Sequence, residues 1–208
     1  MTFLTSPPLD DFPEIPGPTP TVGILASGSG SNFETIARRV DEGRLDSEIA
    51  GLICNNPGAG CLARAERLGV EATVIDHRGF DEREAFDRAV LERLQSMGVE
   101  WVVMAGWMRI VTPTFIEAYR ERILNLHPSL LPSFPGAHAV DDALEAGVRM
   151  TGCTVHIVTE KVDDGPIVAQ AAVPVYDGDD SDALHARIHE AEHHLFPRAI
   201  ALAVAERR

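Results

Sequence analysis

The sequence predicts an α/β fold in which a mainly parallel sheet is flanked by helices. Short apolar runs rich in β-branched residues alternate with longer segments whose apolar residues recur at helical spacing. This rhythm is typical of parallel sheets with right-handed crossovers. After about residue 150 it gives way to two long extended stretches and one long helical segment. We therefore expect a Rossmann-like sheet with an added antiparallel strand pair and a long C-terminal helix.

The first half of the chain carries the repeated strand–helix pattern. Residues 21–26 form a short apolar run that ends at glycines, and beyond it Phe33, Ile36, Ala37 and Val40 mark one face of a helix. Helices are expected to end at glycines, which adopt the left-handed conformation at little cost. By the same criteria we expect strands at 51–54, 72–75 and 101–105, helices at 61–68 and 81–97 (capped by Asp81), and a short helix starting at Thr112-Pro113.

The second half carries a different pattern. Residues 123–127 form one more strand, and residues 151–159 and 166–175 are extended stretches joined by a short acidic segment that ends in Gly-Pro. We expect these two stretches to form a hairpin-like pair, followed by a helix over residues 182–205. Because no linker or internal repeat divides the chain, a single domain is expected over residues 21–208.

Composition limits the class of protein. Residues 1–20 hold six prolines, three acids and no basic residue, which indicates an extended, mostly disordered arm. Across 208 residues, 18 basic and 32 acidic side chains give a net charge of −14. So acidic a surface repels phosphodiester backbones, and a nucleic-acid partner is not expected.

Location and metal content are inferred from what the sequence lacks. It contains no segment typical of a signal peptide or a membrane span, so no membrane partner is expected. Its three cysteines, Cys54, Cys61 and Cys153, follow no zinc-ligand spacing. Sparse cysteines are typical of a reducing compartment, so we expect a cytoplasmic protein without a metal.

The glycine-rich loop at residues 26–32 is a candidate phosphate site. It joins a strand to a helix, so its backbone N–H groups and the positive end of the helix dipole converge on one point. A dinucleotide site is disfavoured, because Phe33 stands where the fingerprint needs a third glycine and no carboxylate follows the second strand. A P-loop is disfavoured too, since no lysine follows the glycines. A phosphomonoester site and a merely tight turn remain as interpretations.

Asn125 and His127 form a polar pair at the end of an apolar strand. Because successive side chains of a strand point to opposite faces, the two share one face, while the leucines of the strand point to the other. Buried polar groups are costly without partners, so the pair is either a satisfied core feature or part of a catalytic site. A carboxylate beside the imidazole would orient it and complete an acid–base unit. Asp163 and Asp164, adjacent in a tight turn, are the candidates.

Helical spacing brings three histidines of the last predicted helix to one face. His185, His189 and His193 recur every fourth residue, and two of them could reach one metal ion. No matching ligand cluster occurs elsewhere, so a partly exposed helix face is favoured. Lys161 is the single lysine and carries no signal of apolar burial, so Schiff-base chemistry is not favoured either.

Four motifs together resemble the formyltransferase family. Residues 28–32 (GSGSN), 105–110 (AGWMRI), 125–132 (NLHPSLLP) and 163–166 (DDGP) occur in the order and spacing of that family. The resemblance covers about residues 21–205 and points to the folate-dependent branch that serves purine synthesis. It implies a transferase that moves the formyl group of 10-formyltetrahydrofolate, as co-substrate, to the amine of glycinamide ribonucleotide.

The resemblance also implies roles for residues of this chain. Asn125, His127 and Asp163 match the catalytic residues of the family, which favours Asp163 over Asp164. Glu192 matches a substrate contact, which weakens the metal interpretation of the neighbouring histidines. The implied contacts of glycinamide ribonucleotide are Gly30, Ser31, Asn32 and Glu192, and those of the folate are Arg83, Met108, Arg109, Ile110, Val111, Asn125 and His156.

The reaction fits these residue types. Attack of the amine on the formyl carbon gives a tetrahedral intermediate with a developing oxyanion, to which the Asn125 amide and a protonated His127 can both donate. Asp163 would keep His127 charged and help to pass a proton from the amine to the leaving nitrogen. The partners are then small molecules, and neither a metal nor a covalent enzyme intermediate is implied. The oligomeric state, a homodimer included, stays open.

Three alternatives compete with this interpretation. Methionyl-tRNA formyltransferase shares the core but carries a second domain and binds tRNA, which an acidic chain ending soon after its last predicted helix does not favour. Formyltetrahydrofolate hydrolase adds a regulatory N-terminal domain, for which residues 1–20 are too short. A non-catalytic nucleotide-binding module is disfavoured because Asn125, His127 and Asp163 are all present.

Overall fold

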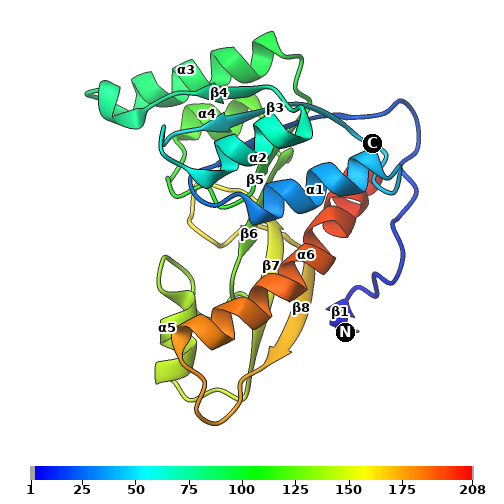
Figure 1. Cartoon of the computed structure of the whole chain (residues 1–208), viewed down its shortest axis with the longest axis vertical. Coiled ribbons are helices and arrows are strands. Elements are labelled where there is room, and N and C mark those ends of the chain that lie inside the picture. The colour runs from blue at the N-terminus through cyan, green and yellow to red at the C-terminus, as the bar shows by residue number, and fades with distance from the viewer. Residues whose placement is uncertain (1–2, 208) are drawn as a thin grey trace. The chain divides into compact units, whose positions relative to one another are not determined.

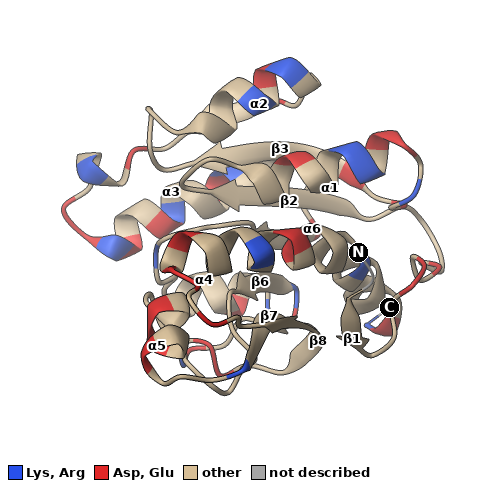
Figure 2. Ribbon diagram, turned by 60° about the horizontal axis from the view of Figure 1, so that its bottom comes forward, with Lys and Arg blue, Asp and Glu red and all other residues tan. Residues whose placement is uncertain are grey.

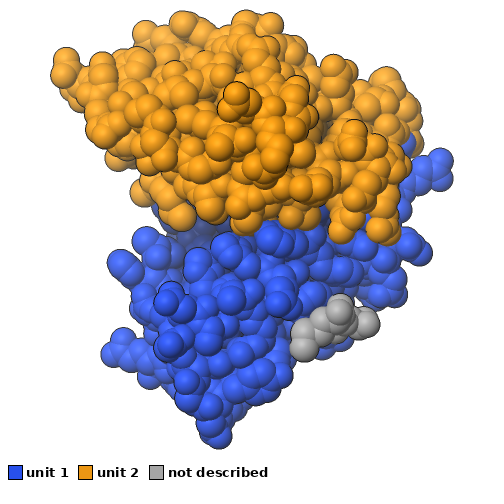
Figure 3. All heavy atoms as spheres, in the orientation of Figure 1, with its two compact units in different colours: residues 1–15, 125–208 blue, residues 16–124 orange. Residues whose placement is uncertain are grey.

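The computed structural model describes residues 3–207, whose contacts fall into two compact units (Figure 3). One unit holds residues 16–124, and the other holds the N-terminal residues up to Ile15 together with the chain from Asn125 onward. The backbone passes from one unit to the other within a single strand, β6 (Ile123–His127). Each unit has its own sheet segment and helices.

The unit of residues 16–124 is a parallel sheet with helices (Figure 1). Its strand order is β5-β2-β3-β4, and every neighbouring pair is parallel. Ile24 pairs with Leu52 on one side and Val103 on the other, and all three side chains are fully buried. The predicted parallel α/β core is confirmed. The elements are β2 (Thr21–Ala26), α1 (Ser31–Asp41), β3 (Glu48–Cys54), α2 (Gly60–Leu68), β4 (Ala72–Val74), η1 (His77–Gly79), α3 (Arg83–Ser96), β5 (Trp101–Met104) and α4 (Pro113–Ala118).

Local sequence explains how these elements end and pack. Gly69 follows α2 with a φ of 69°, as the prediction of a glycine-terminated helix required. Gly23 lets α3 approach β2, because a Cβ at this position would lie 2.6 Å from a leucine methyl group of that helix. The predicted cap Asp81 is wrong. The helix has Glu82 as its N-cap and no side-chain cap, since it begins two residues after Asp81.

The other unit is built on antiparallel strands and the longest helix. Its strand order is β1-β8-β7-β6, with β7 antiparallel to β8. Helix α6 packs on β7 and β8 and buries Leu195, Phe196 and Ile200 completely (Figure 1). The predicted strand pair and long helix are confirmed. No helix within residues 3–207 is long and apolar enough to cross a membrane. The elements, besides the end of β6, are β1 (Leu4–Ser6), α5 (Ala139–Glu145), β7 (Met150–Ile157), β8 (Ile167–Pro174) and α6 (Ser181–Glu206).

Residues 3–15 of the N-terminal arm, for which composition predicts disorder, form one short strand and pack within their own unit; residues 1 and 2 lie outside the described part of the chain. Strand β1 pairs antiparallel with the edge of β8, and Leu9 and Ile15 are 4% and 6% exposed. The guanidinium of Arg198 lies 4.7 Å above the ring centre of Phe12. Composition indicates disorder because six prolines outweigh these few apolar side chains, which are buried within the arm's own unit. The predicted domain boundary at residue 21 stays a prediction.

Candidate active site

The last residues of β6 present a polar pair. Asn125 and His127 are two residues apart in the strand and therefore share a face, as predicted, with Leu126 on the other. His127 is only 4% exposed. A polar ring so deeply buried must find its hydrogen-bond partners within the protein.

Both ring nitrogens of His127 face oxygen acceptors. Nε2 lies 2.8 Å from the carbonyl oxygen of Phe134, and Nδ1 lies 3.4 Å from Oδ2 of Asp163. A neutral imidazole carries one N–H, so only the doubly protonated ring can donate to both oxygens. Phe134 and Asp163 each have a left-handed backbone with a φ of 53°, which is uncommon outside glycine. Both acceptors therefore belong to residues whose backbone conformation is unfavourable for a non-glycine residue. Such strained residues cluster at functional sites.

The carboxylate of Asp163 is buried and hydrogen-bonded. The N–H of Gly136 donates to Oδ2 over 2.8 Å, and Nε2 of His156 lies 3.6 Å from Oδ1. Burial acts to raise the pKa of Asp163, but contacts with His156, the Gly136 N–H and His127 outweigh it and hold the pKa below its ordinary value. Asp163 is thus ionised at neutral pH. Asp164 is half exposed and pairs with the single lysine at 2.9 Å, so the carboxylate beside the imidazole is that of Asp163.

His156 on β7 orients the amide of Asn125. Its Nδ1 lies 3.0 Å from the carbonyl oxygen of Ile157, and its Nε2 lies 3.1 Å from Nδ2 of Asn125. The sequence predicted His156 only as a folate contact, and it missed this contact with two candidate catalytic residues. The folate role stays a prediction.

Buried hydrogen bonds fix the proline-rich loop after β6. Oγ1 of Thr154 donates to the carbonyl oxygen of Ser129 over 2.6 Å and accepts from the N–H of Leu131 over 3.1 Å. Nε2 of Gln170 donates to the carbonyl oxygen of Leu131 over 2.9 Å. These side chains come from β7 and β8, and no sequence motif marked them. They hold the loop that carries the Phe134 carbonyl.

Glu192 lies on the buried face of α6 beside the histidine row. It is 4% exposed, and Nε2 of His189 lies 3.4 Å from its Oε2. The ring of His189 stacks between those of His185 and His193, with centroid distances of 4.6 and 5.8 Å. Burial lowers the pKa of His189. Within residues 3–207 no group of three or more metal-ligating side chains is placed to hold an ion.

The glycine-rich loop leads from β2 into α1 in the other unit. Gly30 is the N-cap of α1 with a φ of 77°, and a Cβ there would lie 2.5 Å from that of Cys61, so the position requires glycine. Ser31 and Asn32 are the first residues of the helix. Gly30 itself has no side chain that could cap this end of α1 by a hydrogen bond. An N-cap glycine therefore brings no side-chain oxygen that would compete with a phosphate for the N–H groups of the first turn.

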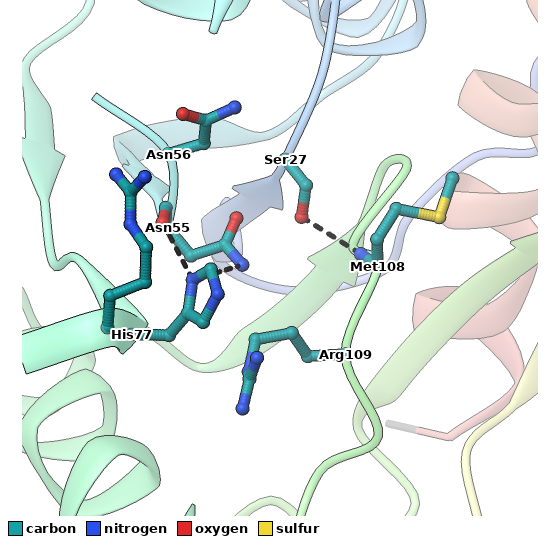
Figure 4. Close-up of a pocket in the computed structure, with 7 residues that line it drawn as sticks. Ser27, Asn55, Asn56, His77, Met108 and Arg109 are labelled. Atoms are coloured by element: carbon teal, nitrogen blue, oxygen red, sulfur yellow. Dashed lines mark hydrogen bonds between the residues drawn. The ribbon is translucent and has the colours of Figure 1, made fainter. Parts of the chain in front are cut away.

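A cavity of about 430 Å³ opens in the same unit (Figure 4). The amide oxygen of Asn55 is buried and has no hydrogen-bond partner among the described residues, so it is free to accept one from a ligand or water. Its neighbour His77 contacts the Asn55 carbonyl oxygen at 3.1 Å through Nδ1. On the other side, Ser27 Oγ accepts from the N–H of Met108 over 2.9 Å. The lining residues are Ser27, Asn55, Asn56, His77, Arg78, Met108 and Arg109.

The predicted folate residues of this unit fall into two groups. Met108 and Arg109 line the cavity, and Met108 is 81% exposed. The other three, Arg83, Ile110 and Val111, are not among the residues that line the cavity. Ile110 is exposed, Val111 is buried, and Arg83 is the first residue of α3. Their assignment to the folate stays a prediction.

Asp87 on α3 anchors the segment that carries these residues, and the sequence did not reveal it. It is 3% exposed, and its Oδ2 accepts from the N–H of Thr112 at 2.6 Å. Burial raises the pKa of Asp87, although the Thr112 hydrogen bonds and the charges of Arg109 and Arg83 act in the opposite direction. The buried carboxyl thus fixes the backbone directly after the cavity lining.

Comparison with known proteins assigns the chain to a family. The family model described as Formyl transferase matches residues 21–200. The chain belongs to the formyl transferase family. The matched range contains all the predicted site residues, from the glycine-rich loop to Glu192 on α6.

The chain is similar to several named proteins and solved structures. The phosphoribosylglycinamide formyltransferase of Bacillus subtilis is 41% identical over 85% of this chain and 91% of its own length. A crystal structure of glycinamide ribonucleotide transformylase 1 from Symbiobacterium toebii matches with a TM-score of 0.89 and 47% identity, over 91% of this chain and 89% of that one. The trifunctional purine biosynthetic protein adenosine-3 of Drosophila melanogaster is 43% identical over 88% of this chain, which spans 14% of that longer protein.

Proposed function

We propose that this formyl transferase moves the formyl group of 10-formyltetrahydrofolate to the amine of glycinamide ribonucleotide, giving formylglycinamide ribonucleotide for purine biosynthesis. Its relatives of similar length are named for glycinamide formyl transfer. The observation that carries the proposal is the buried imidazole of His127, which lies between the Asp163 carboxylate and a backbone carbonyl. That arrangement is the acid–base unit the transfer needs.

The oxyanion is stabilised by two donors in this mechanism. As the amine nitrogen bonds to the formyl carbon, the formyl oxygen takes up negative charge. The Asn125 amide has two N–H donors, and His156 takes one, so the other serves the oxyanion. His127 donates through Nε2 once the oxyanion replaces the Phe134 carbonyl as its acceptor. Each such donor lowers the barrier by about 3 kcal/mol.

The proton balance involves the same residues. The attacking amine must lose a proton, and N10 of the folate must gain one as its bond to the formyl carbon breaks. The ionised carboxylate of Asp163 stabilises the charged ring of His127, and together they pass the proton from the amine to N10. The enzyme therefore returns to its starting state without a metal or a covalent intermediate.

Both substrates are held by residues outside this acid–base unit. The backbone N–H groups of Gly30 and Ser31 and the side chain of Asn32 bind the nucleotide phosphate at the N-terminal end of α1, and Glu192 contacts the same substrate. The folate is bound by Arg83, Met108, Arg109, Ile110 and Val111, with Asn125 and His156 beside its reacting end. We place the enzyme in the cytoplasm, because its few cysteines are typical of a reducing compartment.

The proposal is tested by a spectrophotometric assay of folate release from a 10-formylfolate donor, with and without glycinamide ribonucleotide. Release only in the presence of the nucleotide is the expected result. Release without it would indicate a hydrolase instead. No release in either condition would refute formyl transfer to this amine.

Replacing Asn32 with alanine is expected to raise KM for the nucleotide by about tenfold or more, the effect of one hydrogen bond to a charged group. KM for the folate donor is the internal control and should change less than about twofold, because that substrate makes no contact with the loop in this mechanism. Equal increases in both KM values would show that Asn32 acts on the fold rather than on the phosphate.

A further inference from the structure

A glutamate in the first turn of α1 is enclosed by three arginines. The Glu34 side chain is 12% exposed, with Nη2 of Arg38 at 2.7 Å and Nη2 of Arg67 at 3.0 Å, and Nη1 of Arg64 bound to its second oxygen. The cluster lies on α1 and α2, where Figure 2 shows basic residues in a chain that is acidic as a whole. With three arginines and one glutamate, the cluster has a net charge of +2.

One of these arginines also holds the glycine-rich loop. Nε of Arg64 donates to the carbonyl oxygen of Ser29 over 2.8 Å, whereas the described hydrogen bonds of Arg38 and Arg67 go to Glu34 alone. The preceding carbonyl is held from the same helix, because the N–H of Cys61 donates to the oxygen of Gly28 over 3.1 Å. Two successive carbonyl groups of the loop are thus turned towards α2.

Because the peptide bond is planar, the contacts of these two carbonyl oxygens also fix the directions of the N–H groups that follow them. In a trans peptide, the C=O of one residue and the N–H of the next point in opposite directions. Holding the Gly28 and Ser29 oxygens towards α2 therefore directs the N–H groups of Ser29 and Gly30 away from it. Successive N–H groups directed to one side form a concave nest that binds anions, here directly before the first turn of α1, whose N-cap is Gly30.

We propose that Arg64 is a positioning residue for the nucleotide phosphate. It does not touch the substrate, but it fixes the Ser29–Gly30 peptide so that the N–H of Gly30 faces the phosphate. It also keeps Glu34 turned away from the helix end, where a carboxylate would compete with the phosphate. This inference rests on the proposed role of the Gly30–Asn32 loop.

The test compares Arg64→Ala with the matched control Arg67→Ala, which removes the same charge and the same Glu34 partner but no contact with Ser29. We expect Arg64→Ala to raise KM for glycinamide ribonucleotide about tenfold, the scale of one charge-assisted hydrogen bond, with little change in kcat. Arg67→Ala should raise it less than about twofold, as is typical of an exposed ion pair. If Arg64→Ala fails to fold, Arg64→Met keeps the aliphatic stem and should give the same increase.

A double variant separates the two roles of Arg64. In Arg64→Ala/Glu34→Gln the competing carboxylate is gone, but the Ser29 oxygen still lacks its donor, so KM should stay raised. Recovery of the wild-type KM in this variant would overturn the positioning role. Equal KM values for Arg64→Ala and Arg67→Ala would overturn it as well, because the effect would then come from charge alone.

Binding of ribose 5-phosphate, followed by ³¹P NMR, keeps this inference distinct from the proposed function. If the wild type catalyses no transfer but binds ribose 5-phosphate about tenfold more tightly than Arg64→Ala does, with Arg67→Ala unaffected, the positioning role stands without the activity. If the wild type catalyses transfer and the two variants bind alike, the activity stands and the positioning role fails. If the wild type binds neither ribose 5-phosphate nor glycinamide ribonucleotide, the positioning role and the proposed function are both overturned.

Discussion

Replacing His127 with alanine is expected to lower kcat for formyl transfer by about 10²–10⁴-fold, the range for loss of a general acid or an oxyanion donor. The ring contacts both the Phe134 carbonyl and the Asp163 carboxylate, so its removal takes the donor from the oxyanion and leaves Asp163 without its counter-charge. Steady-state kinetics with both substrates saturating measures the effect on kcat. Circular dichroism should show an unchanged fold, because β6 is held by its backbone.

His138 provides a matched control for this prediction. It follows the same proline-rich loop, at the start of α5, and its side chain is exposed. Alanine at this position removes an imidazole from the same region without touching Asp163, so kcat should stay within about twofold of the wild type, as for most surface substitutions. Wild-type turnover by the His127 variant with an intact circular dichroism spectrum would remove His127 from the mechanism.

The parallel core was predictable because its information is local. Short apolar runs such as residues 21–26, glycines at helix ends such as Gly69, and helical spacing all act within about ten residues of sequence. The loop that ends at Gly30 could be placed for the same reason, since its strand and helix are its direct neighbours. Local patterns were less accurate at helix starts, where the predicted cap Asp81 was wrong.

Most contacts of the site were not predictable from residue patterns, because they join residues far apart in sequence; the pairing of His127 with Asp163 was expected only from the family resemblance. His156 meets Asn125 across 31 positions, and Gln170 reaches the Leu131 carbonyl across 39. Asp163 and Asp164 are equivalent by composition. The left-handed backbone at Asp163 and the hydrogen bond from Gly136 decide which carboxylate faces inward, and neither is written in the local pattern.

Charge removal at Asp163 tests the acid–base unit most sharply, because Asp164 is its matched control. We expect Asp163→Asn to lower kcat by about 10²-fold or more, since an amide cannot balance the imidazolium or accept its proton. Asp164 forms an exposed ion pair, so Asp164→Asn should leave kcat within about twofold. A larger loss in the Asp164 variant would assign the role to that residue instead.

The pH dependence of folding gives a second, independent measure of the same carboxylate. Because contacts in the folded protein hold the pKa of Asp163 below its ordinary value, ionised Asp163 stabilises the fold at pH values above the unfolded-state pKa of about 3.9. As pH falls through that value and then through the lower pKa of the folded state, the contribution is lost. The free energy of unfolding of the wild type should therefore decline more steeply between about pH 5 and pH 3 than that of Asp163→Asn, measured by urea denaturation. Parallel declines would mean that His127, His156 and Gly136 do not stabilise the ionised form, and the charge balance in the mechanism would fail with them.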